Sequence, residues 1–520
     1  MNEIKNVVIV GGGSSGWMTA GALSKHFPEY KITLIESPNT PVIGVGESTL
    51  QGINEYLELI GLTDDNEWMP KCNASYKLAI RYTGFLKDND HAFNFMLSNV
   101  NKILEFDNVD FLLLNKLYPD IQLIDIHKFN HSTYNIAERK KFTDNADNQF
   151  NWDFKTEKAY HVDAIKFGMT IRDIIAIPNG VNHIQDEIVD TVLNSAGEID
   201  YLITQNNGKL SADLFVDCSG FKGLLIEKAL GVKFESFGDL LINDRAVNAN
   251  IPYENKKEEL QPYTNSSTLE NGWLWNIPLW NRVGTGYVYS SKFVDDDTAL
   301  VQFKNGLRKA YGDKRADAID PKFIKFRSGT KEYAWYKNTV AIGLSCGFIE
   351  PLGSTGLMMT HNNIIRLVNI LKLTNSNIKS IDRLAFNSAN KHEIFMARDF
   401  ISWFTAFSHR KDTPYWKYVT EEIDYSCSFN MPGIPELSSI LLSNRLLHSN
   451  PDDLKRLIEK YYNPILDYQF EKMKENNAIN LGHYKRLKTA YDIFQAENNA
   501  KIDKLPSLYE YSKETIYKDS

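Results

Sequence analysis

The feature that most constrains the fold is a glycine-rich turn close to the start of the chain. The apolar run Val7–Val10 leads into Gly11-Gly12-Gly13-Ser14-Ser15-Gly16, and a helical pattern follows from about Gly16 to His26. A second apolar strand, Lys31–Glu36, completes a strand–turn–helix–strand unit, which is typical of a parallel α/β sheet. The sequence therefore predicts a fold that opens with a Rossmann-type unit.

Each glycine of this turn has a physical role if a dinucleotide binds there. Gly11 permits the tight turn, Gly13 lets the backbone approach a pyrophosphate, and Gly16 lets helix and strand pack closely. The helix N-terminus stabilises the phosphate charge. Glu36 lies 25 positions after Gly11 and can accept hydrogen bonds from a ribose diol. The alternative is a glycine-rich turn without a ligand.

A second segment favours FAD over a bound nicotinamide, as does the N-terminal position of the glycine turn. Ala212–Asp217 has the pattern of a buried strand, and it enters the small-residue turn Cys218-Ser219-Gly220. The segment resembles the second flavin contact of glutathione-reductase-like flavoproteins, which implies a cofactor contact near Asp217. An ordinary core strand followed by a turn is the alternative.

The rest of the chain is predicted to add an antiparallel layer and a helical region. Residues 245–290 alternate in polarity and are rich in Trp, Tyr and Gly, whereas the pattern is helical from about 356 onward. We expect an α/β protein with a glutathione-reductase-like FAD-binding Rossmann fold, an antiparallel sheet layer and a mostly helical C-terminal region. The expected boundary lies near residue 375 and separates residues 1–375 from the helical residues 376–520.

Charge and composition exclude several classes of protein. The formal net charge is −8 and no basic run is interleaved with aromatics, which argues against a nucleic-acid partner. No apolar run reaches the roughly 20 residues that span a bilayer, and the N-terminus leaves no room for a signal peptide, so we expect a cytoplasmic protein without a membrane partner. The four scattered cysteines form no CxxC pair, so we expect no metal.

The segment Trp273-Leu274-Trp275-Asn276-Ile277-Pro278 has the pattern W-x-W-x-I-P. This hexapeptide resembles the signature of the flavin-dependent halogenases, the family of the tryptophan halogenases. Two Trp at i and i+2 lie on one face of a strand, and in that family they are thought to crowd the path near the flavin and disfavour monooxygenation. Read alone, the pair would be core aromatics. Further segments resemble the family in its order: Gly44–Thr49, Tyr160–Ala164, Asn243–Val247, Gly284–Ser290 and Asp412–Trp416.

The resemblance implies an FADH2-dependent halogenase, an oxidoreductase that modifies a small aromatic substrate. A separate NAD(P)H-dependent flavin reductase would supply reduced FAD, which with O2 and halide yields hypohalous acid. The acid would travel through the protein to a lysine beside the substrate. The resemblance also implies further cofactor contacts from Ser14, Ser15, Gly46, Glu47, Ser48, Gly343 and Leu352. Residues 1–375 would then form the FAD, halide and substrate module, and residues 376–520 would cover the substrate pocket.

Lys77 matches the lysine of that family. It lies in Asn73–Arg81, an alternating segment that resembles the family's lysine strand. The role needs an amine, either as a donor to hypohalous acid or as a nucleophile whose pKa is lowered by burial. From the segment alone, a surface lysine on a strand is the alternative.

The stretch Gly347–Gly356 is predicted to hold the halide. It follows a buried strand, Val340–Gly343, and leads into a helix, whose first backbone N–H groups form an anion site. The resemblance assigns halide binding to Thr355 and Gly356; a plain helix cap is the alternative. It assigns the shaping of the active site to a wider set, namely Trp273, Trp275, Ile277, Pro278, Glu350, Gly353 and Ser354.

One position departs from the family pattern. Tryptophan halogenases have a glutamate directly before Ser-Thr-Gly, and this chain has Gly353. That glutamate is held to polarise the electrophile or to accept the ring proton, and we do not transfer its role to Glu350. The departure favours an electron-rich indole or phenol over free tryptophan, and bromide or iodide over chloride.

His91 and Phe93 are candidate substrate contacts, because the family has an H-x-F pattern after its lysine, although with a longer gap. A loop histidine is the alternative for His91. Aromatic residues in the helical part could form a substrate lid or belong to the core: Trp403, Phe404, Phe407, Tyr415 and Trp416.

Two other functions remain open at this point. A flavin monooxygenase could hydroxylate an aromatic without halide, but hydroxylation needs no remote lysine, so Lys77 and the W-x-W-x-I-P segment argue against it. A flavoprotein that has lost catalysis is favoured only by Gly353. A substrate carried on another protein is also compatible with the sequence.

Overall fold

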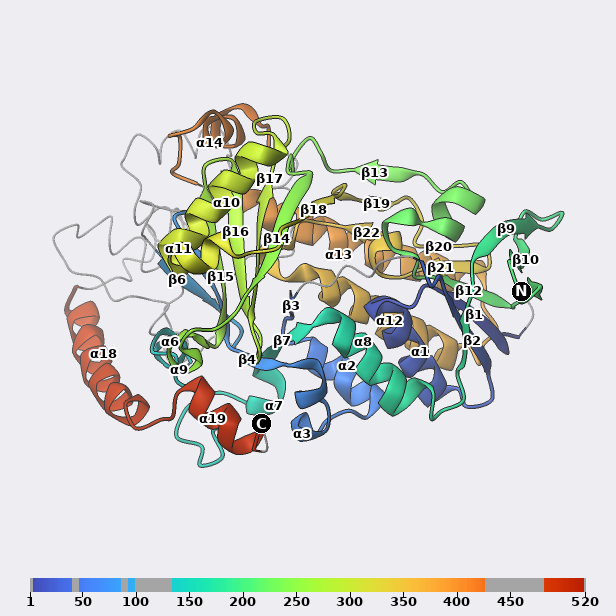
Figure 1. Ribbon diagram of the computed structural model, residues 1–520. Coiled ribbons are helices and arrows are strands. Elements are labelled where there is room, and N and C mark those ends of the chain that lie inside the picture. Colours follow the sequence, from blue (N-terminus) through green and yellow to red (C-terminus); the bar gives the residue numbers. More distant parts are fainter. Residues whose placement is uncertain are drawn as a thin grey trace.

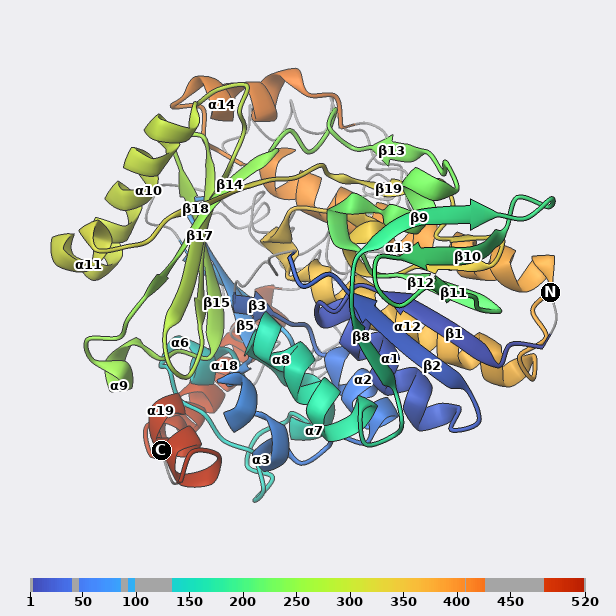
Figure 2. The same ribbon diagram turned by 45° about the vertical axis from the view of Figure 1, so that its right-hand side comes forward.

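The computed structural model describes residues 3–39, 46–85, 92–98, 133–406, 408–425 and 481–518. A mainly parallel sheet and a larger, mainly antiparallel sheet lie on opposite sides of the molecule (Figure 1). A small sheet lies between them, and helices pack around all three (Figures 1 and 2). The predicted α/β class is therefore confirmed.

The parallel sheet is the predicted Rossmann unit. Strand β1 pairs in parallel with β2 on one side and with β12 on the other, so the second predicted flavin segment lies directly beside the glycine turn. Helix α1 begins at Ser14, two residues earlier than expected. In sheet order the strands are β20 (Trp335–Tyr336), β21 (Thr339–Ala341), β12 (Leu214–Asp217), β1 (Asn6–Val10), β2 (Lys31–Glu36) and β8 (Asn182–Gln185).

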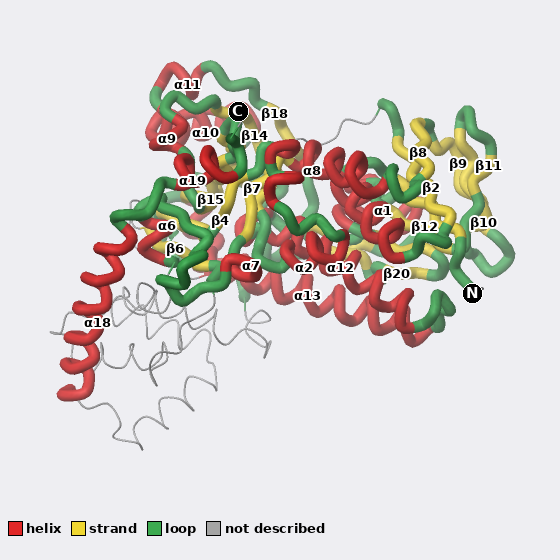
Figure 3. The backbone as a smooth tube through the Cα atoms, turned by 90° about the horizontal axis from the view of Figure 1, so that it is seen from below, coloured by secondary structure: helices red, strands yellow, loops and turns green. Residues whose placement is uncertain are grey.

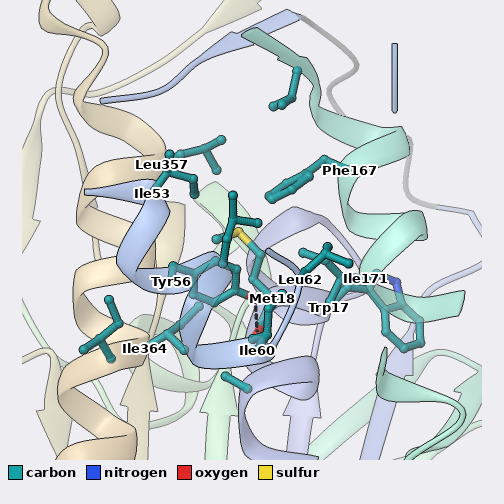
Figure 4. Packing of buried hydrophobic residues seen from close by; sticks show 14 of the residues in the cluster. Trp17, Met18, Ile53, Tyr56, Ile60, Leu62, Phe167, Ile171, Leu357 and Ile364 are labelled. Atoms are coloured by element: carbon teal, nitrogen blue, oxygen red, sulfur yellow. Dashed lines mark hydrogen bonds between the residues drawn. The ribbon is translucent and has the colours of Figure 1, made fainter. Parts of the chain in front are cut away.

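Four helices bury one another beside this sheet: α1 (Ser14–His26), α2 (Ile53–Ile60), α8 (Ala164–Ile171) and α12 (Thr355–Leu373). Met18 of α1 lies among apolar side chains of the other three (Figure 4). The Tyr56 hydroxyl donates to the Met18 carbonyl at 2.8 Å, which satisfies its polar atom inside the core. This packing holds α1 and α12 in place, and the N-termini of these two helices border the candidate site described below.

The second sheet is the predicted antiparallel layer, with one parallel pairing between β15 and β5. Alternate residues of β16 face opposite sides of it: Leu274 packs with α10 (Asp296–Tyr311), whereas Trp273 and Trp275 pack with α13 (Ser380–Ala406). In order the strands are β18 (Lys322–Lys325), β14 (Arg245–Ile251), β17 (Val283–Tyr289), β16 (Gly272–Pro278), β15 (Tyr263–Leu269), β5 (Ala79–Thr83) and β6 (Ala92–Met96).

The small central sheet has the order β3 (Gly46–Ser48), β7 (Ala159–Asp163) and β4 (Ser75–Lys77). Strand β10 (Ile199–Thr204) belongs to a separate antiparallel sheet with β9 (Ile188–Leu193) and β11 (Lys209–Leu210). A further small sheet contains β13 (Phe234–Ser236), β19 (Gly329–Lys331) and β22 (Gly347–Phe348).

The described C-terminal region is helical, as expected (Figure 3). The expected boundary near 375 falls in the turn between α12 and α13. The later helices are α14 (Pro414–Lys417), α18 (Leu481–Ile502) and α19 (Leu508–Thr515), and the short helices elsewhere are α3 (Asp65–Trp68), α6 (Tyr134–Glu138), α7 (Phe154–Glu157), α9 (Lys256–Glu259) and α11 (Asp313–Asp317). In the described ranges, no helix is long and apolar enough to cross a membrane.

The segment after α19 packs behind the strand that carries Lys77. The Tyr517 ring stacks on Trp280 with 3.9 Å between ring centroids, and its hydroxyl lies 2.7 Å from the Ala74 carbonyl oxygen. We expect Tyr517→Ala to lower the free energy of unfolding by about 3 kcal/mol, because a buried aromatic ring leaves a cavity. Tyr517→Phe keeps the ring and should cost about 1 kcal/mol. Chemical denaturation of both variants distinguishes a packed segment from a loosely attached one, for which both values would be close to zero.

Candidate active site

The glycine turn has the shape that a bound pyrophosphate needs. Gly11 has φ +112°, and a Cβ atom there would lie 2.3 Å from the Cys218 carbonyl oxygen, so only glycine lets β1 and β12 run into this turn together. A Cβ atom at Gly16 would lie 1.9 Å from the Gly11 carbonyl oxygen. By contrast, a Cβ atom at Gly13 would meet no heavy atom within 4 Å. Open space therefore faces the N-terminus of α1, which fits a flavin diphosphate.

Glu36 lies at the end of β2, where a ribose diol was predicted. Its carboxylate extends over the turn, because a Cβ atom at Gly12 would lie 1.7 Å from Glu36 Oε2. His183 of β8 contacts the other oxygen, with 2.7 Å between Nε2 and Glu36 Oε1. His183 therefore holds this carboxylate at the predicted ribose position, a contact that the sequence alone did not reveal.

Asp217 shapes the second flavin turn from inside the protein. Its side chain is fully buried. One carboxylate oxygen accepts from the Ser219 backbone and hydroxyl at 3.0 and 2.6 Å, and the other accepts from Leu225 and Ile226 N–H, both at 2.8 Å. With its oxygens occupied by the chain itself, Asp217 acts on the turn, so a direct contact with the flavin stays a prediction.

Other predicted cofactor residues border the same region. The Ser14 hydroxyl donates to the Ala164 carbonyl at 2.8 Å, which joins the start of α1 to α8. Gly343 has φ +76°, and a Cβ atom there would lie 2.7 Å from the Ser15 Cβ. The chain after β21 thus passes directly over the start of α1. Leu352 is buried, and its carbonyl accepts from the Tyr82 hydroxyl at 3.1 Å.

The predicted halide segment lies at the start of α12. Ser354 has left-handed backbone dihedrals with φ +59°, and its side chain makes no cap hydrogen bond, so the plain cap is not formed. The Thr355 Oγ1 is buried and has no partner among the described residues, and a Cβ atom at Gly356 would meet nothing within 4 Å. A donor without a partner and open space at a helix N-terminus fit an anion such as halide.

Lys77 is fully buried at the end of β4. Its Nζ donates to the Thr49 carbonyl at 2.7 Å and to the Ser354 hydroxyl at 3.1 Å. Burial lowers the pKa of this amine well below its usual value. The predicted lysine is therefore not a surface residue, and it contacts the residue that directly precedes Thr355.

Strand β3 packs beside this amine. The backbone of Gly46 lies close to Ile277, since a Cβ atom there would be 3.3 Å from its side chain. Desolvation raises the pKa of Glu47 to about 7, so this carboxyl is partly protonated at neutral pH. The Ser48 hydroxyl accepts from Ser354 at 3.0 Å, so β3 is connected to Lys77 through one hydroxyl.

Trp273 and Trp275 lie on the same face of β16, with 6.0 Å between their ring centroids. Gly286 leaves room for Trp275, because a Cβ atom there would lie 2.2 Å from the indole ring. Trp273 Nε1 donates to Glu350 at 2.7 Å, and Asn243 donates to the same oxygen at 2.8 Å. Glu350 is buried and fixes the orientation of Trp273, which agrees with keeping it apart from the role of the family's glutamate.

The space beside Gly353 is filled by an aromatic ring. A Cβ atom at this position would lie 2.8 Å from Phe400 of α13, and Phe400 is buried against Phe404 and Phe95. The ring therefore occupies the place toward which a side chain at 353 would extend. The chain could not accept the family's glutamate here without moving α13 or this ring.

This contact gives a testable coupling between positions 353 and 400. We expect Gly353→Glu to destabilise the wild-type protein by about 1–3 kcal/mol through overpacking. In the Phe400→Ala background the same change should cost at least about 1 kcal/mol less, because the ring is gone. Denaturation of both single variants and the double variant measures the coupling, and additive effects would show that Phe400 does not block a side chain at 353.

Aromatic residues of the helical region pack on the strand that follows Lys77. The Tyr82 ring lies 4.2 Å from Phe404 and 5.4 Å from Phe93, centroid to centroid. Phe93 is thus buried in an aromatic cluster, whereas His91 and Phe407 lie outside the described residues. Three other predicted lid residues, Trp403, Tyr415 and Trp416, are buried in the same core.

Sequence reasoning did not assign a role to several residues that the fold brings to Lys77. His161 belongs to the quoted Tyr160–Ala164 segment and lies fully buried on β7, and Thr264 lies on β15. The Thr264 hydroxyl lies 2.5 Å from Ser48 Oγ, and His161 Nε2 lies 3.0 Å from the same Thr264 hydroxyl. Their connection depends on how the small central sheet packs against the second sheet, which carries Thr264 on β15, and no local pattern reveals that packing.

This fold and the glycine turn define a flavin-dependent oxidoreductase of the glutathione-reductase-like class. The protein-family model "Tryptophan halogenase" matches residues 6–430. The tryptophan 6-halogenase SttH of Streptomyces toxytricini is 34% identical over 79% of this chain and 80% of its own length. The tryptophan 7-halogenase RebH of Lentzea aerocolonigenes is 31% identical over 80% and 78%. The solved apo structure of VirX1 has a TM-score of 0.86 and 36% identity, and covers 99% of this chain and 100% of that chain.

The chain therefore belongs to the tryptophan halogenase family. It is an FADH2-dependent oxidoreductase that uses FAD and halide. The resemblance inferred from the W-x-W-x-I-P segment is confirmed.

Proposed function

We propose that this enzyme halogenates an electron-rich indole or phenol, with Lys77 as the group that presents the halogen to the substrate. We also propose that it uses bromide or iodide in preference to chloride. The observation that carries the proposal is the buried Lys77 amine, held 3.1 Å from the hydroxyl of Ser354, the residue directly before the predicted halide site at Thr355 and Gly356. Bound reduced FAD would supply the two electrons that activate O2, and the activated oxygen would oxidise halide to hypohalous acid.

The residues of the chain would then divide the work. The N–H groups at the start of α12 would hold the halide, and Trp273 and Trp275 would restrict the space beside the flavin. Two donor positions of Lys77 are occupied by the chain, so its remaining position is directed by those contacts. A group held in this way can orient hypohalous acid or attack its halogen.

The absence of a side chain at Gly353 supports the substrate class. No carboxylate at this position can accept the ring proton, so the proposed substrate is an arene that attacks a weak electrophile readily. Hypobromous and hypoiodous acids are easier to make than hypochlorous acid, which supports the proposed halide order. The names of the relatives give tryptophan or 7-chloro-L-tryptophan as the substrate of those proteins. For this chain we propose that free tryptophan is a poor substrate.

We further propose that the helical region after residue 375 covers the substrate pocket. Phe400 and Phe404 of α13 pack against Tyr82 and Phe93 on the strands that follow Lys77. The same α13 meets the face of the second sheet that carries Trp273 and Trp275. A separate NAD(P)H-dependent flavin reductase would supply the reduced FAD, because the sequence contains no recognisable NAD(P)H module.

A substrate screen tests the proposal. Small indoles and phenols are incubated with the protein, a generic flavin reductase, and chloride, bromide or iodide in turn, and products are identified by mass. The proposal predicts brominated or iodinated products and little product from tryptophan with chloride. Hydroxylated products formed without halide would instead establish a monooxygenase, and flavin oxidation without any product would establish a protein that has lost catalysis.

A further inference from the structure

A continuous chain of buried hydrogen bonds joins Lys77 to His161. The Lys77 Nζ donates to Ser354 Oγ at 3.1 Å, and Ser354 donates to Ser48 Oγ at 3.0 Å. Ser48 Oγ lies 2.5 Å from Thr264 Oγ1, which lies 3.0 Å from His161 Nε2. All these side chains are buried. The chain crosses from β4 through the start of α12, β3 and β15 to β7.

The far side of the imidazole fixes the direction of every donor in this chain. Ser75 Oγ donates its single proton to the Pro278 carbonyl, which can only accept. His161 Nδ1, at 3.1 Å from Ser75 Oγ, must therefore carry the proton and donate it. In the neutral ring Nε2 is then an acceptor, so Thr264 donates to His161, Ser48 donates to Thr264, and Ser354 donates to Ser48.

This direction is the one that carries a proton away from the lysine. We propose that His161 is the proton-relay partner of Lys77, and that Ser354, Ser48 and Thr264 pass one proton between the two; the inference rests on the proposed halogenase function. His161 touches neither halide nor substrate in this account. It acts through the amine, so it is a positioning residue.

The relay balances the reaction without a glutamate at position 353. The Lys77 ammonium passes a proton to Ser354, each hydroxyl passes on its own, and His161 Nε2 gains one. The Lys77 amine then attacks the halogen of hypohalous acid: an N–halogen bond forms, the O–halogen bond breaks, and the hydroxide takes one N–H proton and leaves as water. When the arene takes the halogen, the N–halogen bond breaks and the relay returns its proton to Nζ.

The arene's ring proton completes the cycle, because the Lys77 amine accepts it and becomes an ammonium again. The sum is one arene and one hypohalous acid converted into one halogenated arene and one water. Neither Lys77 nor His161 is changed, and no outside base is required. The relay thus carries only the proton that leaves Lys77 and returns to it, and the ring proton of the arene leaves through Lys77 after the halogen has been transferred.

Lys77 and His161 can exchange one proton because only one of the two groups is charged at a time. Burial lowers the pKa of Lys77 and also that of His161, and the nearby positive charge of Lys77 lowers the His161 value further. That second cause disappears once the proton has left the lysine. Among the described residues, the groups that hydrogen-bond the His161 ring are Ser75, Thr264 and the Pro278 carbonyl, and none of them is charged.

The ring tautomer of His161 gives a test that needs no turnover. The protein, with its 11 histidines labelled with nitrogen-15, is measured by NMR at neutral pH, and the His161 signals are assigned by their loss in His161→Gln. The relay predicts a proton on Nδ1 and none on Nε2. A proton on Nε2 in the neutral ring would prevent Thr264 from donating, and it would overturn the proposal.

A kinetic test uses a variant that keeps the hydrogen bonds. In His161→Gln the amide can accept from Thr264 and donate to Ser75, but it cannot hold an extra proton. With an arene found in the screen, we expect kcat to fall by about 10²-fold, the KM for the arene to stay unchanged, and the kinetic solvent isotope effect to decrease. Wild-type kcat and isotope effect in this variant would contradict the relay.

Two threonine variants make a matched pair for the same assay. Thr264→Val interrupts the relay and should behave as His161→Gln does. Thr339→Val removes a buried hydroxyl that has no partner among the described residues, and it should leave kcat unchanged. Equal loss in both would assign the effect to packing. If the wild-type protein halogenates no arene, the proposed function fails, and the tautomer of His161 still decides whether the relay exists.

Discussion

Lys77→Met is expected to lower the rate of arene halogenation by about 10³-fold while reduced FAD is still oxidised at the wild-type rate. Methionine fills nearly the same volume but cannot donate to hypohalous acid or attack its halogen, and loss of such a group costs on the order of 10²–10⁴ in rate. The amine is fully buried and bonded to Thr49 and Ser354, so its position is fixed by the fold. Product yield and flavin oxidation are measured in the same reaction.

The control for this variant is a second buried lysine. Lys331 on β19 is also almost fully buried, but it pairs with Glu227, which keeps Arg327 as a partner when Lys331 is replaced. Lys331→Met should therefore leave product formation unchanged. Undiminished product from Lys77→Met would show that another group carries the halogen, and equal losses in both variants would point to a general effect of burying methionine.

Gly13→Val should weaken flavin binding by roughly 10–100-fold without unfolding the protein. The loss corresponds to the charge-assisted hydrogen bonds to the pyrophosphate, about 1.5–3 kcal/mol. The backbone of Gly13 is extended with φ −75°, and a Cβ atom there meets no heavy atom within 4 Å, so the position has room for a side chain. The free energy of unfolding should change by about 1 kcal/mol or less. Flavin fluorescence titration and denaturation give the two values.

Gly16→Val supplies the contrast, because a Cβ atom there would overlap the Gly11 carbonyl oxygen. This variant should lose stability as well as flavin binding. If Gly13→Val bound FAD as tightly as the wild type, the open space at the start of α1 would not be the pyrophosphate site. If it unfolded instead, the space would not be open.

The parts of this protein that follow from local patterns could be predicted from the sequence. The strand–turn–helix unit at Val7–Gly16 needs only neighbouring residues, and alternation in 245–290 correctly indicates an antiparallel layer. The alternation also explains why Trp273 and Trp275 share a face while Leu274 packs on the other. Lys77 was identified by resemblance, because nothing in its own segment separates a buried lysine from an exposed one.

The parts that the sequence did not reveal depend on long-range pairing. Strand β10 pairs with β9 and β11 in a sheet of its own, and the sequence alone does not say which strands pair. Phe400 meets Gly353 only because α13 folds back over the second sheet. The link from Lys77 to His161 needs side chains from four strands and one helix, and it is visible only when they are assembled.

The central claim is that a halogen oxidant made at the flavin reaches the Lys77 amine inside the protein, and a scavenger experiment tests it most directly. Single turnovers with bromide and an arene are run with increasing amounts of a bulky thioether polymer that destroys hypobromous acid in bulk solution but cannot enter the protein. If the oxidant stays inside the protein, the yield of brominated arene stays constant in wild-type protein. A yield that falls in proportion to the scavenger would contradict it, because the oxidant would then be released into solvent before it reacts.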